Sequence, residues 1–369
     1  MLRLFKGEFK GKLLERIDSS TPYILFGASE AGKKTLDELQ KLDMSVSYFC
    51  DNDPHKWGSF IQDIKVLSPQ ELVDVLDGHK IIISSTYEEE IKKQLVTLGL
   101  AEYIFEGNFY DLEFTGLIMD RRRKAAEKEF KIEALKRYLN DEKSKTVLEN
   151  VILYRATGDL EFLFRVAEPC EYFPDDLIRL TDEEVFIDAG AYTGDTIAAF
   201  LEKVKNQYKQ IIAFEPDTNT FRRLRSCVYE ITHRTGEIHN IQIHEVGLSN
   251  TTKKVNYTNN GFMHSRIEDN GTYTVEVVSL DEILGVNNEV TFIKMDIEGE
   301  EYNAILGAQE LIKKYKPKLA ICVYHKFDDL WEIPLLLKKL VPEYKIYLRH
   351  HGLYEPAEMY DTICYAVAD

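Results

Sequence analysis

The sequence predicts an α/β protein with two doubly wound, mostly parallel sheets and a helical connector between them. Short apolar segments alternate with segments of helical spacing towards both ends of the chain, whereas the middle of the chain has helical spacing and no strand pattern. Two glycine turns each stand between an apolar segment and a helical one. A length of 369 residues also favours two domains, at about 150 residues per domain.

The first domain is expected over residues 1–116. Its strands are expected at residues 23–26, 46–50 and 81–85, and its helices at residues 33–42 and 91–98. Gly27 and Gly32 bound the turn after the first strand, Ser29 replaces a middle glycine, and Asp51 ends the second strand. This degenerate pattern fits a nucleotide or sugar-nucleotide site, and it fits equally well glycines that only allow close strand–helix packing.

The connector is expected over residues 117–167. Phe130, Ile132, Leu135 and Leu139 recur at helical spacing, so we expect helices that pack on one or both domains. The basic run at residues 121–124 is interpreted as a solvated helix face, because acidic residues follow it closely.

The second domain is expected over residues 168–369. Its strands are expected at residues 185–189, 211–215, 241–246, 292–296, 319–323, 344–348 and 362–367. The last two are expected to form a hairpin that places an antiparallel strand at the edge of the sheet. Residues 255–257 and 273–278 predict an inserted β-hairpin.

The glycine turn at residues 188–196 is the most informative motif of the second domain. It leaves an apolar strand and enters a helix, so backbone N–H groups and a helix N-terminus face a ligand there. The next expected strand ends in an acid, whose carboxylate can accept both hydroxyls of a ribose. The residues expected to bind the cofactor are Asp188, Gly190, Ala191, Tyr192, Gly194, Asp195, Thr196, Glu215, Asp217 and Tyr172.

Three of these residues have structural alternatives. Asp217 can cap the following helix instead of supporting an adenine edge. Asp195 can complement the dipole of its helix while it pairs with the ammonium group of a cofactor. Tyr172 can pack over the cofactor or simply belong to the hydrophobic core.

Two features of the turn favour S-adenosylmethionine over a dinucleotide. Tyr192 occupies the position at which a dinucleotide fold needs a glycine for close approach to the pyrophosphate. Asp188 would repel a pyrophosphate, whereas a sulfonium and an α-ammonium group tolerate or favour a carboxylate. An NAD(P)-dependent sugar-nucleotide-modifying enzyme is an alternative that would use the first domain, although no convincing Tyr-x-x-x-Lys helix stands there. A non-catalytic nucleotide-binding module is the other alternative.

Three segments of the second domain carry a joint pattern. They are residues 171–173 with 186–196, residues 292–301 continuing to 306–308, and residues 323–326 with 329–334. Together they resemble the FkbM family of S-adenosylmethionine-dependent methyltransferases, over residues 168–369. The resemblance implies a class I methyltransferase fold and O-methylation, commonly of a sugar or polyketide hydroxyl. The first domain resembles nucleotide-sugar-binding Rossmann-like units more loosely, which implies a module for substrate recognition.

Methyl transfer to an unactivated hydroxyl requires orientation and a group that takes the proton. Asp296 and His325 each follow an expected strand, so both reach the edge of the sheet where ligands bind. His325 is expected as the base, and Asp296 either as the base or as the group that orients the acceptor. Lys294, on the same strand face as Asp296, is expected to lower the pKa of a neighbouring acid, bind an acceptor oxygen or form a buried ion pair.

Other residues of this domain carry weaker interpretations. Asp296, Glu298 and His325 could together hold a divalent cation such as magnesium, although we do not predict a metal site. His350 and His351 are expected either to line the acceptor pocket or to be exposed. His264, with the neighbouring residues 265 and 266, could reach the cofactor or the acceptor.

Composition limits the partners and the compartment. A formal net charge of −17 disfavours nucleic acid and anionic membranes as partners. The five cysteines lie far apart without metal-ligand spacing, and the N-terminus has no signal-peptide core, so we expect a cytoplasmic protein with reduced thiols. No apolar run approaches the ~20 residues that span a bilayer. The expected partner is a small-molecule or carbohydrate substrate, and a homo-oligomer is possible.

Overall fold

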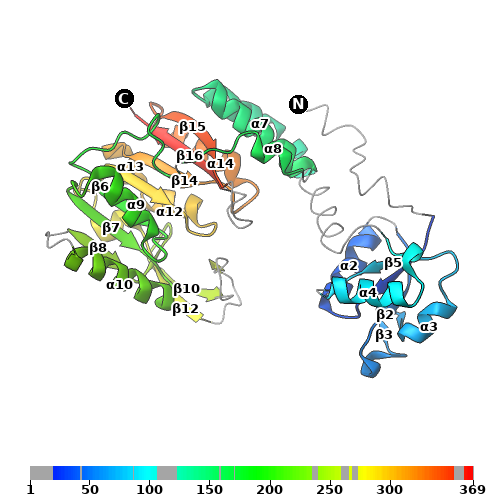
Figure 1. Ribbon diagram of the computed structural model, residues 1–369. Coiled ribbons are helices and arrows are strands. Elements are labelled where there is room, and N and C mark those ends of the chain that lie inside the picture. Colours follow the sequence, from blue (N-terminus) through cyan, green and yellow to red (C-terminus); the bar gives the residue numbers. More distant parts are fainter. Residues whose placement is uncertain are drawn as a thin grey trace. The chain divides into compact units, whose positions relative to one another are not determined.

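A computed structural model describes residues 20–41, 44–85, 87–105, 123–157, 159–169, 171–234, 240–258, 266–267, 273–352 and 361–368. The described chain forms two compact units (Figure 1). The first contains the described residues up to Glu127 together with residues 153–157, and the second contains Lys128–Ile152 and the described residues from Asp159 onward.

The first unit is built around a sheet of five strands in the order β3-β4-β2-β1-β5. Its strands are β1 (Tyr23–Phe26), β2 (Val46–Cys50), β3 (Phe60–Ile61), β4 (Ile64–Leu67) and β5 (Lys80–Ile83). Its helices are α2 (Glu30–Lys41), α3 (Pro69–Asp74) and α4 (Glu88–Thr97), with short 3-10 turns at Pro54–Lys56 and Ala101–Tyr103. The predicted strands β1, β2 and β5 are parallel neighbours. The antiparallel pair β3–β4 was not predicted.

The second unit contains a sheet of seven strands in the order β15-β16-β14-β13-β6-β7-β8 (Figure 1). They are β6 (Val185–Ala189), β7 (Gln210–Phe214), β8 (Ile241–His244), β13 (Phe292–Met295), β14 (Lys318–Cys322), β15 (Lys345–His350) and β16 (Thr362–Val367). All seven predicted strands are present. The predicted terminal hairpin β15–β16 forms at this end of the sheet, and its antiparallel strand β16 lies between β14 and β15.

The remaining elements of the second unit surround this sheet. The inserted hairpin forms between β10 (Lys253–Thr258) and β12 (Tyr273–Val278), and β9 (Gly247–Leu248) and β11 (Arg266–Ile267) extend it to a sheet of four strands. The helices are α9 (Asp195–Val204), α10 (Thr218–Arg234), α11 (Leu280–Leu284), α12 (Glu301–Gly307), α13 (Gln309–Tyr315) and α14 (Asp329–Leu340).

An aromatic cluster fixes the strand pair β6–β13 under helix α9. The Phe186 ring stacks on Phe200 of α9 and on Phe292 of β13, with ring centroids 4.6 and 5.1 Å apart. Phe173 packs on the edges of the same rings. Because side chains alternate along a strand, Asp188 and Lys294, two residues further on, point to this same side of the sheet.

The connector helices are α6 (Glu129–Tyr138), α7 (Glu142–Thr157) and α8 (Glu161–Phe164). The segments around them cover strand β15, the last strand of the large sheet. Leu139 forms a parallel bridge with Ile346, and Ala167 forms one with His350. The amide of Asn140 donates to the Ile346 carbonyl over 2.9 Å, so residues of the predicted connector complete the hydrogen bonding of this sheet edge.

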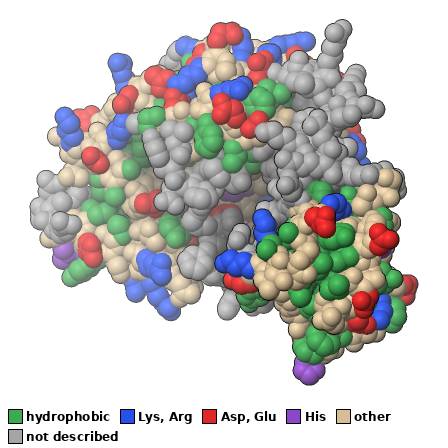
Figure 2. All heavy atoms as spheres, turned by 45° about the vertical axis from the view of Figure 1, so that its right-hand side comes forward, with side chains coloured by type: hydrophobic (Ala, Val, Ile, Leu, Met, Phe, Trp, Pro, Cys, Tyr) green, Lys and Arg blue, Asp and Glu red, His purple; other side chains and the backbone are tan. Residues whose placement is uncertain are grey.

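Charges of both signs share the surface. Figure 2 shows acidic and basic side chains interspersed over the face that it draws. Within the described part of the chain, no helix combines the length and the apolar character needed to cross a bilayer.

The glycine turn after β6 adopts backbone conformations that favour glycine. Gly190 has φ +74° and Gly194, which caps α9, has φ +94°. A Cβ atom on Gly190 would lie 1.8 Å from the carbonyl oxygen of Asp296, and one on Gly194 would lie 2.9 Å from the sulfur of Cys227. The turn can therefore pass this close to the end of β13 and to α10 only because neither residue has a side chain.

We expect Gly190→Ala to destabilise the second unit by more than the ~1 kcal/mol that a positive φ costs a residue with a side chain. The additional loss comes from the collision with backbone that cannot move away. Gly285→Ala is the matched control, since Gly285 has φ +73° with no atom within 4 Å of the added Cβ. Denaturant unfolding of both variants measures the difference, and equal losses would contradict the close approach at Gly190.

Candidate active site

A buried ion pair lies where the strand order of the large sheet reverses. Asp188 of β6 and Lys294 of β13 are cross-strand neighbours, 0% and 2% exposed, with 3.2 Å between Oδ1 and Nζ. Burial raises the pKa of Asp188 to about 6 against the attraction of Lys294. Burial would lower the pKa of Lys294, but the charges of Asp188 and Asp296 raise it above its ordinary value. Both groups are therefore charged at neutral pH.

Lys294 also holds the glycine turn. Its ammonium group donates to the carbonyl of Gly190 over 2.7 Å and to that of Ala189 over 3.3 Å. The structure thus realises the buried ion pair among the alternatives for Lys294. This geometry favours a role in positioning the turn for both Lys294 and Asp188.

Glu215, directly after β7, connects the two loops that border the expected cofactor site. Its carboxylate accepts the amide of Tyr192 over 3.1 Å and the amide of Asp217 over 2.9 Å. Burial raises the pKa of Glu215 to about 7, although these two amides oppose the rise. A carboxylate offers about four acceptor sites, so two remain for the hydroxyls of a ligand.

Several other predicted cofactor residues belong to the same two loops. The amides of Gly190 and Ala191 donate to the carbonyl of Phe214. Tyr192 and Asp195 are exposed, whereas Ala191 and Thr196 are buried. Asp217 accepts the amide of Thr220 over 2.8 Å, so it caps helix α10, as its structural alternative proposed.

Asp296 is the centre of a polar cluster at the end of β13. It accepts hydrogen bonds from the hydroxyls of Tyr172, at 2.9 Å, and Tyr324, at 3.3 Å. Partial burial favours its neutral form, but Lys294 and His325, together with these hydroxyls, hold its pKa below the ordinary value. Tyr172 therefore contacts the predicted catalytic carboxylate, and its ring lies 5.2 Å from the ammonium group of Lys294.

His325 lies between carboxylates on both sides of its ring. Nε2 is 3.3 Å from Asp296 Oδ1, and Nδ1 is 2.9 Å from Glu301 Oε1. Burial lowers the pKa of His325, but Glu301, Asp296 and Glu298 together raise it to about 9. In the protein without ligand, the three acids around the ring therefore favour the protonated form of His325.

A divalent cation has possible ligands in this cluster. Single ligand atoms of Asp296, Glu301 and His325 all lie within 4.8 Å of one another. Glu298, which the sequence offered as an alternative ligand without predicting a metal site, lies 3.8 Å from Nε2 of His325. Both ring nitrogens of His325 already face carboxylates in the described arrangement.

Two residues of the cluster were missed in the sequence. Glu301 begins α12 and is fully buried, and its carboxylate also accepts the amide of Ile297 over 2.8 Å. The sequence signal that could have identified Glu301 is its position in the acidic run that follows Asp296. Tyr324 directly precedes His325, and the two rings lie 4.1 Å apart.

Other predicted residues lie outside the cluster. His350 and His351 are both buried, which excludes the exposed one of their two alternatives. His350 contacts the Thr362 hydroxyl, and His351 contacts the Tyr365 hydroxyl, each over 3.0 Å. His264 and Ser265 lie outside the described residues, and Arg266 belongs to β11.

The turn of the first unit repeats one part of this arrangement. Asp51, directly after β2, accepts the amide of Ala28 over 2.7 Å and that of Asp53 over 2.9 Å, and pairs with Lys56. A Cβ on Gly32 would lie 2.0 Å from the carbonyl oxygen of Gly27, so close packing of β1 and α2 accounts for Gly32.

Comparison with known families assigns both parts of the chain. Residues 188–360 match the methyltransferase FkbM domain, and residues 20–105 match the C2185-like N-terminal domain. No match was found among curated proteins.

One of the similar solved structures supports the fold of the whole chain. The chain is similar to methyltransferase FkbM from Methylobacillus flagellatus KT, with 22% identity, a TM-score of 0.63, and coverage of 96% of this chain and 92% of the other. An rRNA methylase from Streptococcus thermophilus has 14% identity and a TM-score of 0.31, with 57% and 94% coverage. A putative methyltransferase from Streptococcus mutans, in complex with SAH, has 13% identity and a TM-score of 0.31, with 56% and 94% coverage.

The strand order of the large sheet, with one antiparallel strand beside the last, agrees with the expected class I methyltransferase fold. The predicted family and cofactor are confirmed for this part of the chain. After a C2185-like N-terminal domain, the chain carries an S-adenosylmethionine-dependent methyltransferase domain of the FkbM family.

Proposed function

We propose that the protein transfers a methyl group from S-adenosylmethionine to a hydroxyl of a sugar or glycoconjugate precursor. The observation that carries this proposal is the array Asp296–His325–Glu301 at the end of the strands next to the glycine turn. An alcohol oxygen needs a group that removes its proton, and a histidine held between two carboxylates is suited to that task.

The side chains around the turn are chemically suited to S-adenosylmethionine. We propose that Glu215 accepts the ribose hydroxyls through its remaining acceptor sites, and that Gly190, Ala191, Tyr192 and Gly194 border the methionine part. The exposed carboxylate of Asp195, in the first turn of α9, is available for an ammonium group. When bound, the cofactor supplies an electrophilic methyl group on a sulfonium.

In the proposed step, Asp296 orients the acceptor hydroxyl and His325 takes its proton. The acceptor oxygen bonds to the methyl carbon as the carbon–sulfur bond breaks, and the hydroxyl proton passes to Nε2. His325 must then start neutral, with its own proton on Nδ1 facing Glu301. Lys294 holds the turn through the carbonyl of Gly190 and takes no proton.

Glu215→Gln is expected to weaken binding of S-adenosylmethionine by about 10- to 100-fold, because each lost charge-assisted hydrogen bond is worth about 1.5–3 kcal/mol. Isothermal titration measures the affinity. Since burial raises the pKa of Glu215 to about 7 and ribose hydroxyls favour the carboxylate, wild-type affinity should fall as the pH drops below about 7. Glu202→Gln, an exposed change on α9, is the charge control. An unchanged affinity for S-adenosylmethionine in Glu215→Gln would show that Glu215 does not bind the ribose.

The pH–rate profile is expected to identify the base. If His325 is the base, turnover rises with pH towards about 9, because three carboxylates raise the pKa of His325 to about 9 and only the neutral ring accepts a proton. Glu301→Gln removes one of these charges and should move the rise to lower pH. A profile that is flat from pH 6 to pH 9 in both proteins would instead assign the base to Asp296, whose pKa is lowered.

We further propose that the N-terminal domain recognises a nucleotide part of the acceptor. The turn after β1 supports this proposal. There the Asp51 carboxylate accepts a hydrogen bond from the amide of Ala28, as the Glu215 carboxylate does from the amide of Tyr192. Ser29 is exposed in this turn. Ser29→Trp should abolish binding of nucleoside diphosphate sugars and preserve binding of S-adenosylmethionine. Titration of both ligands into the full chain is the measurement, and nucleotide affinity that survives the substitution would contradict the proposed site.

The acceptor class is tested directly by a screen. The full-length protein would be incubated with S-adenosylmethionine carrying a deuterated methyl group and with nucleotide sugars and cell-surface glycan precursors. A labelled methyl group on a sugar oxygen, found by mass spectrometry, is the expected result. Tight binding of NAD with no binding of S-adenosylmethionine would contradict the proposed function.

A further inference from the structure

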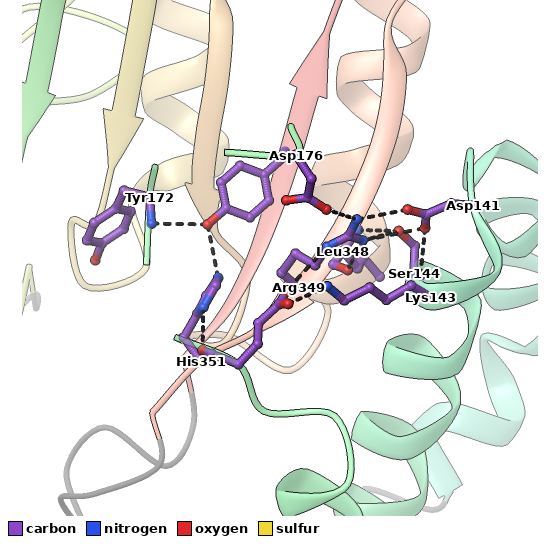
Figure 3. Close-up of polar contacts among 10 residues, drawn as sticks. Asp141, Lys143, Ser144, Tyr172, Asp176, Leu348, Arg349 and His351 are labelled. Carbon is purple, nitrogen blue, oxygen red and sulfur yellow. Dashed lines mark hydrogen bonds and ion pairs between the residues drawn. The ribbon is translucent and has the colours of Figure 1, made fainter. Parts of the chain in front are cut away.

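A second polar network leads from the connector to the candidate active site. Arg349 of β15 is only 1% exposed and contacts three carboxylates (Figure 3). Its Nη2 atom lies 2.8 Å from Asp141 Oδ2 and 3.3 Å from Asp176 Oδ2, and its Nε atom lies 3.2 Å from Glu168 Oε1. Asp141 precedes helix α7, whereas Glu168 and Asp176 belong to the segment that leads to β6.

The start of α7 is tied to the same strand. Ser144 is fully buried, and its hydroxyl accepts both the guanidinium group of Arg349 and the amide of Leu348. Asp141 accepts the amide of Ser144 over 2.7 Å, which caps the helix. The acids around Arg349 are therefore held by the connector on one side and by the segment 168–176 on the other.

A hydrogen-bond chain then fixes Tyr172 within that segment. The Tyr172 amide donates to the Tyr365 hydroxyl over 3.0 Å, and this hydroxyl lies 3.0 Å from Nε2 of His351 (Figure 3). Nδ1 of His351 lies 3.0 Å from the Glu168 carbonyl, which only accepts. The proton of His351 is therefore on Nδ1, and Tyr365 donates to Nε2 while it accepts from Tyr172.

The conformation of Tyr172 needs such support. Its φ is +59°, which side chains other than glycine rarely adopt. In this conformation its amide faces Tyr365 while its hydroxyl reaches Asp296 Oδ2. Without the backbone anchor at Tyr365, the residue can relax to a commoner conformation and withdraw its hydroxyl from Asp296.

We propose that Tyr365 is a positioning residue which, with Arg349 as the anchor of segment 168–176, holds the Tyr172 hydroxyl on Asp296. The consequence for methyl transfer rests on the proposed function, because Asp296 orients the acceptor there. The coupling between Tyr365 and the Asp296–His325 pair is a property of the folded chain without ligand, and can be measured without an acceptor.

The test compares Tyr365→Phe, Tyr172→Phe and the double variant in the full-length protein. The readout is the titration of His325, followed by NMR of ring carbons in protein with labelled histidine. The groups that face His325 are Glu301 on α12, Asp296 after β13, Glu298 in the next turn, Tyr324 beside the ring and Asp329 on α14. None of the substitutions changes them.

We expect the pKa of His325 to rise by at least a few tenths of a pH unit in Tyr172→Phe. Asp296 then loses a hydrogen-bond donor, so its negative charge stabilises the protonated histidine more strongly. Tyr365→Phe should give a similar rise, and the double variant no further rise, since both changes break one chain of contacts. Hydrogen–deuterium exchange of residues 171–173 should quicken in Tyr365→Phe.

Tyr344→Phe is the matched control. Tyr344 is also fully buried, and its hydroxyl donates to the carbonyl of Pro317 over 2.7 Å. It should lose comparable stability and leave the His325 titration and the exchange of residues 171–173 unchanged.

Glu168→Gln tests the Arg349 anchor with a partly exposed residue, and it should quicken the same exchange. Additive shifts in the double variant, or a His325 titration in Tyr365→Phe that matches wild type, would overturn the proposal. Absence of S-adenosylmethionine binding would contradict the proposed function and would leave this coupling in place.

Discussion

The contact on which the site depends is the buried pair of Asp188 and Lys294. It lies between the strands where the sheet reverses its order, and the lysine also binds two carbonyls of the glycine turn. Removing one partner of such a pair leaves an uncompensated buried charge and costs about 3–5 kcal/mol. The same lysine lowers the pKa of Asp296, so one ammonium group both shapes the turn and keeps the neighbouring carboxylate charged.

On the other side of Asp296, acidic side chains gather around His325. Glu298, Glu301 and Asp296 surround one imidazole, and the pKa of Glu298 is raised to about 7, mainly by burial. If the cofactor binds as proposed, its positive charge favours the charged forms of these acids and competes with the proton on His325. The proposed site would then link cofactor binding to deprotonation of the histidine through the carboxylates that they share.

The sequence was informative where a local pattern decides the structure. Strand β6 and its glycine turn were predicted from an apolar run followed by glycines, and Asp296 and His325 were placed at one edge because each follows a strand. The β3–β4 pair was missed, because Gln62 and Asp63 adopt positive φ values in a turn without glycine. The position of β16 and the approach of Glu301 to His325 depend on contacts between distant elements, which no local pattern records.

The covered edge of the large sheet has a consequence for how the chain can be divided. A fragment that begins at residue 168 would lack the partners of Ile346 and Leu348, and would expose an open strand edge to other chains. It would also remove Asp141 and Ser144, two partners of Arg349. We therefore expect that a stable excised methyltransferase domain must begin near Lys128. In an evolutionary exchange of modules, the connector would have to be inherited with the catalytic domain.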